Sequence, residues 1–425
     1  MYSAFFSGDF LRRVGFLIFA LLLYRFGGFI TIPLVDPSYL GGLLSQTFGS
    51  GIFGTFDLFA GGALGRMTIF ALNVMPYIVS SIVVQIFIAL LKSEGKIDSG
   101  FDHSKVSFYS RILCIFLSLF QASVMIFGLQ RLGVLPAEAS FFDKSVCVST
   151  LVGGALLLVW LGGQITSRGI GNGISMIIFT GIVAELPSSL SNIFSSSGLG
   201  SGYGMLLCFA IILLVVMIVF FEKSYRNVSV SYPVRHHGIR RAASASPSFI
   251  PIKINVSGVI PPIFASAIVL FPLTLAESFK NSDLGSILIN YLAFGQPLYF
   301  LFYCVLIAFF SFFYADFVFS TKDLSDSLKK SGAIVAGKRP GIVTKQYLDY
   351  VLSRITVLGA SYLCFVCVLP DIIKSLSGFN FAVSGTSLLI MASVAMDFVS
   401  QLQIHAFNNR YSSLSKNKGF AVLNR

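Results

Sequence analysis

The chain has 425 residues, of which 55% are hydrophobic and only 11% are charged, and its formal net charge is +12. Its mean hydropathy of +0.83 lies far outside the balance of soluble domains, which excludes a water-soluble enzyme or binding module. The composition therefore predicts a single polytopic membrane domain.

Apolar runs recur along the chain, each about as long as the roughly 20 residues that a helix needs to cross the hydrocarbon core. The first run follows Arg12 and Arg13, and nothing short terminates it, so we expect a retained span and no cleaved signal peptide. In chain order the runs predict about ten spans, at residues 14–34, 68–91, 109–130, 147–165, 173–190, 205–221, 257–276, 298–319, 351–370 and 384–404.

Positive charge is distributed unevenly between the two sides that these spans define. With the N-terminus inside, nearly all of the 30 Lys and Arg residues fall in cytoplasmic segments. Arg25 lies within the first span, and the outer side holds Arg66, Arg131, Lys144, Lys280 and Lys374. The positive-inside rule then predicts that both termini are cytoplasmic.

The stretch "FDLFAGGALGRM", residues 56–67, follows the first span and is apolar but too short to cross a membrane. Gly61 and Gly65 spell GxxxG, which is typical of a helix-dimer face, but that motif needs a span of about 20 residues around it. Non-spanning backbone at membrane depth is tolerated only inside protein or in a watery cavity. The sequence therefore predicts a short re-entrant segment.

Two predicted cytoplasmic loops, at residues 222–256 and 321–350, are long and basic. Such loops can simply enforce topology or contact anionic lipid. They can also form a docking site for a large acidic or nucleic-acid-rich partner, such as a ribosome or a soluble motor. The residues alone leave both interpretations open.

Sequence patterns that carry chemistry are missing: we find no nucleotide-binding loop, zinc-protease motif or serine-hydrolase motif. "GIGNGIS" at 169–175 has glycines but lies between two spans, so it predicts a tight cytoplasmic turn. Cys364 and Cys367 form a CxxC in uniformly apolar surroundings, which favours small buried side chains over a redox or zinc pair. We expect no catalytic residue, no metal and no cofactor.

From composition alone, a secondary carrier or ion channel is the first alternative, and a membrane-embedded transferase is another. A carrier should show paired charges near the bilayer centre, and an enzyme should show acidic or His clusters at a membrane face. The main intramembrane charges are Arg25, Asp316 and Asp397, and both aspartates lie near predicted inner ends. The sequence therefore contains neither the paired charges that a carrier requires nor the acidic or His clusters that an enzyme requires.

Six stretches, in order, resemble the SecY family, the channel subunit of the protein-conducting translocon, and the resemblance runs from about residue 10 to the C-terminal tail. They are "FITIPLVD" (29–36), "LFAGGALGRMTIFALNVMPYIVSSIVVQIF" (58–87), "WLGGQITSRGIGNGISMIIFTGIVAELP" (160–187), "IPIKINVSGVIPPIFASAIVLFP" (250–272), "LKKSGAIVAGKRPG" (328–341) and "GTSLLIMASVAMDF" (385–398). Any one stretch is weakly specific, whereas six at the expected spacing are highly specific.

The resemblance implies an all-α polytopic protein whose ten spans form two pseudo-symmetric five-helix halves around an hourglass pore. The halves would be residues 1–195 and 196–404, joined at "SNIFSSSGLGSGYG" (191–204) and followed by a cytoplasmic tail at 405–425. The segment at about 55–67 would be the plug, a re-entrant half-helix in the outer funnel. Its residues include Phe56, Leu58, Phe59, Gly61, Gly62, Leu64, Gly65 and Arg66.

The resemblance also implies a ring of aliphatic side chains that seals the pore. The matching ring residues are Val74, Ile78, Ile178, Ile263 and Ile390. The second and seventh spans would flank a lateral gate to lipid, and their prolines are expected to remove backbone donors and weaken these helices. The matching gate residues are Asn73, Pro76, Gln85, Pro261 and Pro262, where Asn73 replaces the glycine that is usual in the family.

In this family the two long loops dock the ribosome and, in bacteria, the SecA ATPase. Arg339 in "GKRPG" would be the central contact, because Pro340 restricts it to an extended backbone and the flanking glycines let the loop turn. Further docking candidates are Lys338, Arg235, Arg240 and Arg241. The resemblance further implies small SecE-like and SecG-like subunits, signal sequences and unfolded polypeptides as substrates, and a multi-pass location in a bacterial plasma membrane, with the thylakoid as the alternative.

Overall fold

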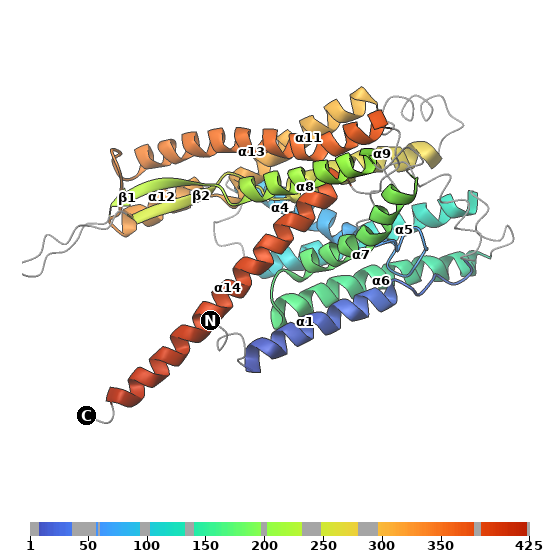
Figure 1. Cartoon of the computed structure of the whole chain (residues 1–425), viewed down its shortest axis with the longest axis horizontal. Coiled ribbons are helices and arrows are strands. Elements are labelled where there is room, and N and C mark those ends of the chain that lie inside the picture. The colour runs from blue at the N-terminus through green and yellow to red at the C-terminus, as the bar shows by residue number, and fades with distance from the viewer. Residues whose placement is uncertain are drawn as a thin grey trace, which may run out of the picture. The chain divides into compact units, whose positions relative to one another are not determined.

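The structure is a computed structural model that describes residues 8–35, 57, 60–93, 103–131, 140–196, 202–231, 248–278, 296–377 and 384–422 (Figure 1). Each predicted span overlaps one helix within these residues. The helices are α1 (Gly8–Gly27), α4 (Met75–Ser93), α5 (His103–Arg131), α6 (Phe141–Arg168), α7 (Gly173–Ser196), α8 (Gly202–Glu222), α9 (Ile260–Ser278), α11 (Pro297–Val318), α13 (Ile342–Ser377) and α14 (Gly385–Val422).

Several of these helices meet the requirements of a membrane span by length and composition alone. Among the described residues, the qualifying stretches are Lys105–Gln130, Phe141–Arg168, Pro297–Lys330, Ile342–Lys374 and Gly385–His405. Side chains such as Phe116 on α5 and Leu213 on α8 are large, apolar and more than 60% exposed. Surfaces of this kind are stable against lipid and would be costly against water. The chain is therefore an all-α polytopic membrane protein.

The chain divides into two compact units. The first comprises Met1–Met205, Ser278–Lys280 and Leu376–Arg425, and the second comprises Leu206–Glu277 and Asn281–Ser375. The first boundary lies close to the predicted division after residue 195. The prediction placed α14 with the second half, whereas α14 groups with the first unit because it packs against α7. Pseudo-symmetry between five-span halves stays a prediction.

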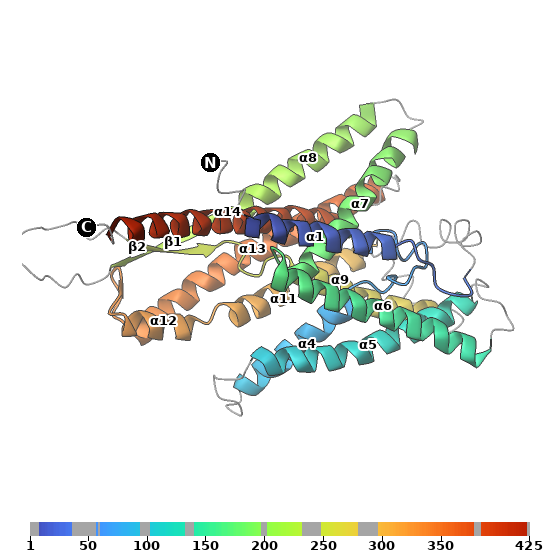
Figure 2. The same ribbon diagram turned by 90° about the horizontal axis from the view of Figure 1, so that it is seen from below.

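In the first unit, consecutive helices pack against one another from α4 to α7, and α1 lies against α6 and α7. Figure 2 shows α4 and α5 side by side. The apolar core of this unit draws on α5, α6 and two non-helical segments, which are residues 28–35 after α1 and residues 60–74 before α4. Its buried members are Ile32, Val35, Met67, Ala71, Ala122, Ile126, Leu129, Cys147, Leu151 and Val152.

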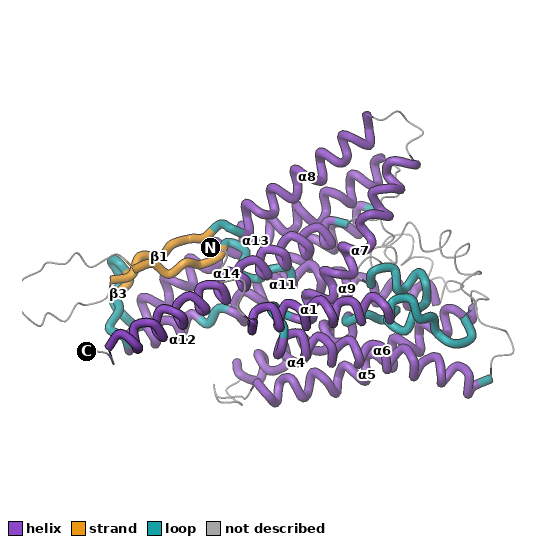
Figure 3. Tube along the Cα trace, turned by 60° about the horizontal axis from the view of Figure 1, so that its bottom comes forward, coloured by secondary structure: helices purple, strands orange, loops and turns teal. Residues whose placement is uncertain are grey.

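The second unit contains a three-stranded antiparallel sheet that the sequence analysis did not predict. Strands β1 (Tyr225–Ser231), β2 (Ser248–Lys253) and β3 (Ile334–Val335) are ordered β2-β1-β3, so the two long basic loops share one sheet (Figure 3). In the register, Val228 pairs with Ile250 and Val230 pairs with Val335. The sequence analysis located both loops but did not predict that they pair with each other.

Alternation of side chains explains why this sheet forms. Val228 and Val230 are buried, while their neighbours on β1 are exposed, as expected for a strand with one face on a core. That core also takes residues from α13 and from the short helix α12 (Thr321–Lys330), whose first turn is capped by the Ser320 hydroxyl. The two loops therefore form one small platform, which we define as residues 225–231, 248–253 and 320–341.

Proline placement differs from the prediction. Pro76 is the second residue of α4, and Pro261 and Pro262 are the second and third residues of α9. A first-turn proline costs little, because its missing N–H group would have no partner within the helix. The predicted weakening of these helices by the three prolines is therefore wrong. The second span also begins later than predicted, at Met75, because residues 68–74 form turns.

The turn between α6 and α7 confirms the interpretation of "GIGNGIS". Gly171 has a φ of 95°, and a side chain at Gly173 would overlap the carbonyl oxygen of Gly162. The Gly173 N–H donates to the Thr166 hydroxyl at 2.9 Å. Glycine is required here for a tight turn. Of the predicted joint at 191–204, residues 191–196 are helical and 197–201 lie outside the described residues.

Candidate functional site

Residues 60–74, between α1 and α4, form a continuous run of turns at the first unit's core. The part of this run around Met67 and Ile69, which we call its base, is held by backbone hydrogen bonds to the residues that follow α1. The Ile32 N–H donates to the Met67 carbonyl at 3.0 Å, and the Ile69 N–H donates to the Ile30 carbonyl at 3.0 Å. Buried backbone groups need such partners. The base is thereby fixed next to α1.

The predicted plug helix is only partly described. Phe56, Leu58 and Phe59 lie outside the described residues, and residues 60–67 are turns, not the helix that was predicted. Gly61 and Gly62 have φ values of 64° and 76°, which a right-handed helix cannot accommodate. We use the name tip segment for Asp57 together with residues 60–66.

Glycines also allow the tip segment to approach α7 closely. A Cβ added at Gly61 would lie 2.9 Å from the Cα of Gly181, and a Cβ at Gly62 would overlap the Glu185 carboxylate. A Cβ at Gly65 would lie 2.7 Å from Asp57 Oδ2. The small residues that suggested a helix-dimer motif therefore serve backbone packing inside one unit.

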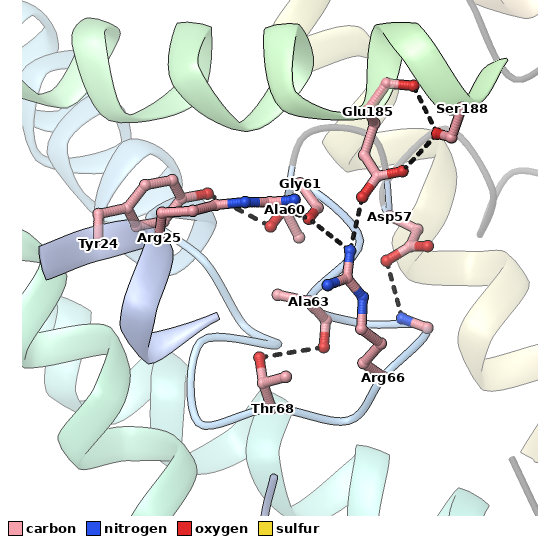
Figure 4. A network of polar contacts seen from close by, with 11 residues as sticks. Tyr24, Arg25, Asp57, Ala60, Gly61, Ala63, Arg66, Thr68, Glu185 and Ser188 are labelled. Atoms are coloured by element: carbon pink, nitrogen blue, oxygen red, sulfur yellow. Dashed lines mark hydrogen bonds and ion pairs between the residues drawn. The ribbon is translucent and has the colours of Figure 1, made fainter. Parts of the chain in front are cut away.

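A polar network surrounds the tip segment (Figure 4). From α1, Arg25 Nη1 donates to the Gly61 carbonyl at 2.9 Å and the Tyr24 hydroxyl donates to the Ala60 carbonyl at 3.3 Å. From α7, Glu185 Oε1 accepts from Arg66 Nη2 at 2.7 Å, which makes an ion pair. Two helices thus hold the tip segment from different sides.

Aromatic and acidic groups complete the network. The Phe29 ring lies 5.2 Å from the Arg25 guanidinium carbon and 5.1 Å from that of Arg66, within the range of cation–π attraction. Asp57 Oδ1 accepts from the Gly65 N–H at 2.7 Å. Two guanidinium groups and two carboxylates balance in charge. Burial, followed by the neighbouring Glu185 charge, raises the pKa of the Asp57 carboxyl, while the Gly65 N–H opposes this rise.

Sequence reasoning missed two members of this network. Arg25 was noted as an intramembrane charge, and Arg66 as part of the plug, but Glu185 and Asp57 were not singled out. Glu185 lies four residues after Gly181 on α7, so both face the same side of the helix. The available signal was a glycine and a carboxylate on one face of a helix. Such a pair allows a polar segment to pack closely against the glycine and to bind the carboxylate.

The predicted ring residues are mostly buried apolar side chains. Val74, Ile178 and Ile390 in the first unit and Ile263 in the second are each less than 9% exposed, and Ile78 is half-buried. The Val74 carbonyl accepts from the Ile78 N–H at 3.1 Å, so the predicted i, i+4 pair is in helical geometry. Ile178 and Ile390 lie on α7 and α14, which pack together. Closure of a ring across both units stays a prediction.

Asn73 and Gln85 were predicted to belong to the lateral gate. Asn73 is buried and has a φ of 51°, a left-handed conformation that asparagine tolerates better than most residues. Asn73 therefore adopts a backbone conformation that glycine reaches without strain. Gln85 is half-buried on α4.

The predicted docking residue Arg339 lies at an exposed turn of the platform, beside Lys338 and Pro340. Gly337 and Gly341 have φ values of 76° and 103°, so the expectation that glycines turn the loop is confirmed. The Arg339 carbonyl accepts from the buried Thr344 hydroxyl at 2.8 Å, which holds the backbone in place.

The remaining predictions concern three further docking residues and metal binding. Arg235, Arg240 and Arg241 lie outside the described residues. Within the described ranges, no group of three or more His, Cys, Asp or Glu residues could hold a metal ion.

Comparison with known proteins gives one consistent result. A family model for SecY matches residues 68–399. The protein translocase subunit SecY of Rickettsia typhi is 42% identical over 424 residues, covering 96% of this chain and 96% of that protein. The solved structure of a protein conducting channel has a TM-score of 0.67 at 15% identity, covering 94% of this chain and 93% of its own. Sec61 in the canine ribosome-channel complex has a TM-score of 0.63 at 17% identity, with the same coverage.

Proposed function

Because the chain belongs to the SecY family, we propose that it forms a channel through which unfolded secretory polypeptides cross the membrane and from which membrane-protein helices pass sideways into lipid. The observation that carries this proposal is the match to a SecY translocase subunit over 96% of the chain. The described geometry supports it as well, because residues 60–74, where the sequence predicts a non-spanning segment, form turns that contact α1 and α7.

Sealing at rest is proposed to depend on two layers. Val74, Ile78, Ile178, Ile263 and Ile390 would meet at a narrow neck, where apolar side chains exclude water and ions yet part around a passing chain. The tip segment would serve as the plug that fills the outer funnel beneath this neck. Its close packing through glycines, with few large side chains, favours a contact that can be reversed.

Movement of substrate requires energy from a partner, since we propose no bond-making chemistry in this chain. The platform is the proposed docking site for a ribosome or for a SecA motor ATPase, with Arg339 at its exposed turn. Lys338, Pro340, Arg235, Arg240 and Arg241 are proposed to assist. The basic charge of these residues suits nucleic-acid-rich or acidic surfaces. Small SecE-like and SecG-like subunits are the proposed membrane partners.

Lateral release is proposed to occur between α4 and α9. Asn73 precedes α4, Pro76 lies in its first turn and Gln85 near its middle, whereas Pro261 and Pro262 lie in the first turn of α9. We propose a bacterial plasma membrane as the location, with both termini in the cytoplasm. The thylakoid membrane is the alternative location. The positive-inside rule supports the orientation, because the platform and the chain ends are basic.

A reconstituted translocation assay tests this function. Proteoliposomes that contain the chain with its small subunits are mixed with a SecA-type motor, ATP and an unfolded secretory polypeptide. We expect the polypeptide to become protected from added protease in an ATP-dependent way. Vesicles without the chain are the control, and equal protection in both preparations would overturn the proposal.

A further inference from the structure

The run of turns at residues 60–74, which includes residues 60–66 of the tip segment, is attached to the rest of the first unit in two different ways. At its base, buried backbone hydrogen bonds link Met67 and Ile69 to the chain that leaves α1. At its tip, most contacts to α1 and α7 are made by side chains, from Tyr24, Arg25 and Glu185. Backbone pairs in a buried core are costly to break, whereas side chains can change partners. The base is therefore the fixed end and the tip is the end that can be released.

The tip contacts are suited to reversible release. The Arg66 and Glu185 side chains are 37% and 19% exposed, so water can reach the pair and replace its hydrogen bonds. The Gly61 carbonyl accepts from Arg25 and, at 3.5 Å, from Arg66, so both guanidinium groups converge on one acceptor. An apolar contact of the same size would offer less directional control of where the tip sits.

Geometry also shows where release would pivot. Met67 is fully buried and has a φ of 46°, which is rare for a residue with a long side chain. It stands between the fixed base and the tip segment, and its carbonyl carries one of the base hydrogen bonds. A strained residue at the junction of a fixed and a releasable part is well placed to absorb a change in backbone angles.

We propose that Arg25, Arg66 and Glu185 form a polar latch that positions the tip segment in the resting state and releases it about Met67. This inference rests on the proposed channel function and goes beyond it, because it names the residues that set the balance between closed and open states. Arg25 and Glu185 are positioning residues on fixed helices, and Arg66 is their counterpart on the moving segment.

Resting ion leak of proteoliposomes, measured without substrate or motor, tests the latch. A partly exposed charge-assisted hydrogen bond is worth roughly a tenfold factor in an equilibrium constant. We therefore expect Glu185→Gln and Arg66→Gln each to raise the leak roughly tenfold. Because they remove the same contact, the double variant should leak about as much as either single variant.

Charge exchange separates a latch from a general packing role. Arg66→Glu and Glu185→Arg should each raise the leak, and the combined exchange should lower it again toward that of the unchanged chain. Lys144→Glu is the matched control, since it reverses a charge on the outer side of α6 outside the network. An exchange variant as leaky as both single reversals, or a leak unaffected by Glu185→Gln, would overturn the proposal.

Folding and channel function are controlled in the same preparations. Arg25→Lys keeps a positive charge and is expected to cause a smaller leak than Arg25→Gln, so it provides a milder variant if another variant fails to fold. Translocation by the unchanged chain shows that the proposed function holds. If the unchanged chain translocates and all latch variants remain impermeable to ions, only the latch inference fails. If the unchanged chain does not translocate, the proposed function fails.

Discussion

Gly153 and Gly154, neighbours on α6, provide a test of how the turns are packed. A Cβ added at Gly154 would overlap the carbonyl oxygen of Ile69, at the base of the tip segment, whereas a Cβ at Gly153 would meet nothing within 4 Å. We therefore compare Gly154→Ala with Gly153→Ala. The two variants add the same methyl group to the same helix, but the group faces the turns at residues 60–74 only in Gly154→Ala.

The expected free energies follow from this geometry. Replacing glycine by alanine in a helix interior stabilises by about 0.5–1 kcal/mol, which is the whole effect expected for Gly153→Ala. Overpacking of a core costs about 1–3 kcal/mol, and the upper end applies to Gly154→Ala because backbone atoms cannot rotate away. The net destabilisation for Gly154→Ala is then about 2–2.5 kcal/mol after the helix gain is subtracted.

Thermal unfolding in detergent and resting leak in vesicles measure this difference. Gly153→Ala should melt at or above the temperature of the unchanged chain and remain tight. Gly154→Ala should melt lower and leak more, because the base that anchors the tip segment is pushed from α6. Equal melting temperatures for the two variants would refute the packing of residues 67–70 against α6.

Three further predictions concern the ring, the platform and the buried acid. Replacing Ile78, Ile178 and Ile263 together with Ser should raise resting ion leak, because water enters a neck that apolar groups keep dry; an unchanged leak would mean that the ring is misplaced. Arg339→Glu should abolish motor-driven or ribosome-coupled translocation without lowering the melting temperature, and normal export would remove the docking proposal. Since burial raises the pKa of Asp57 in the folded chain, its ionised form costs stability, and this cost declines as the pH falls below the raised pKa and is gone below the pKa of the unfolded chain. Asp57→Asn should therefore raise the melting temperature relative to the unchanged chain, by an amount that grows as the pH rises through this range and vanishes in acid. A constant difference across pH would contradict this assignment.

Hydropathy was sufficient to locate the helices. Each predicted span overlaps one helix from α1 to α14, because lipid requires an apolar, internally hydrogen-bonded segment wherever the chain crosses. Helix starts were less predictable. The start of α4 depends on turns at 68–74 that are set by Asn73 and by packing against α6, which no local pattern reports.

The platform and the polar network show what a single sequence hides. Val228 and Val230 alternate with exposed residues, so β1 was recognisable, but its partner β3 lies about a hundred residues away and has only two residues. Pairing at such separation depends on the tertiary fold. Glu185 likewise became significant only when the fold brought Arg66 to within 2.7 Å of it.

The central claim is that an unfolded polypeptide passes through this chain, and photocrosslinking from the proposed ring tests it most directly. A photoreactive residue is placed at Ile178 or Ile263, and at the exposed Phe116 on α5 as the control. Translocation is then stalled with a polypeptide that carries a folded C-terminal domain. We predict crosslinks to the stalled polypeptide from both ring positions and none from Phe116. Crosslinks from Phe116 alone, or from no position during active translocation, would contradict the account.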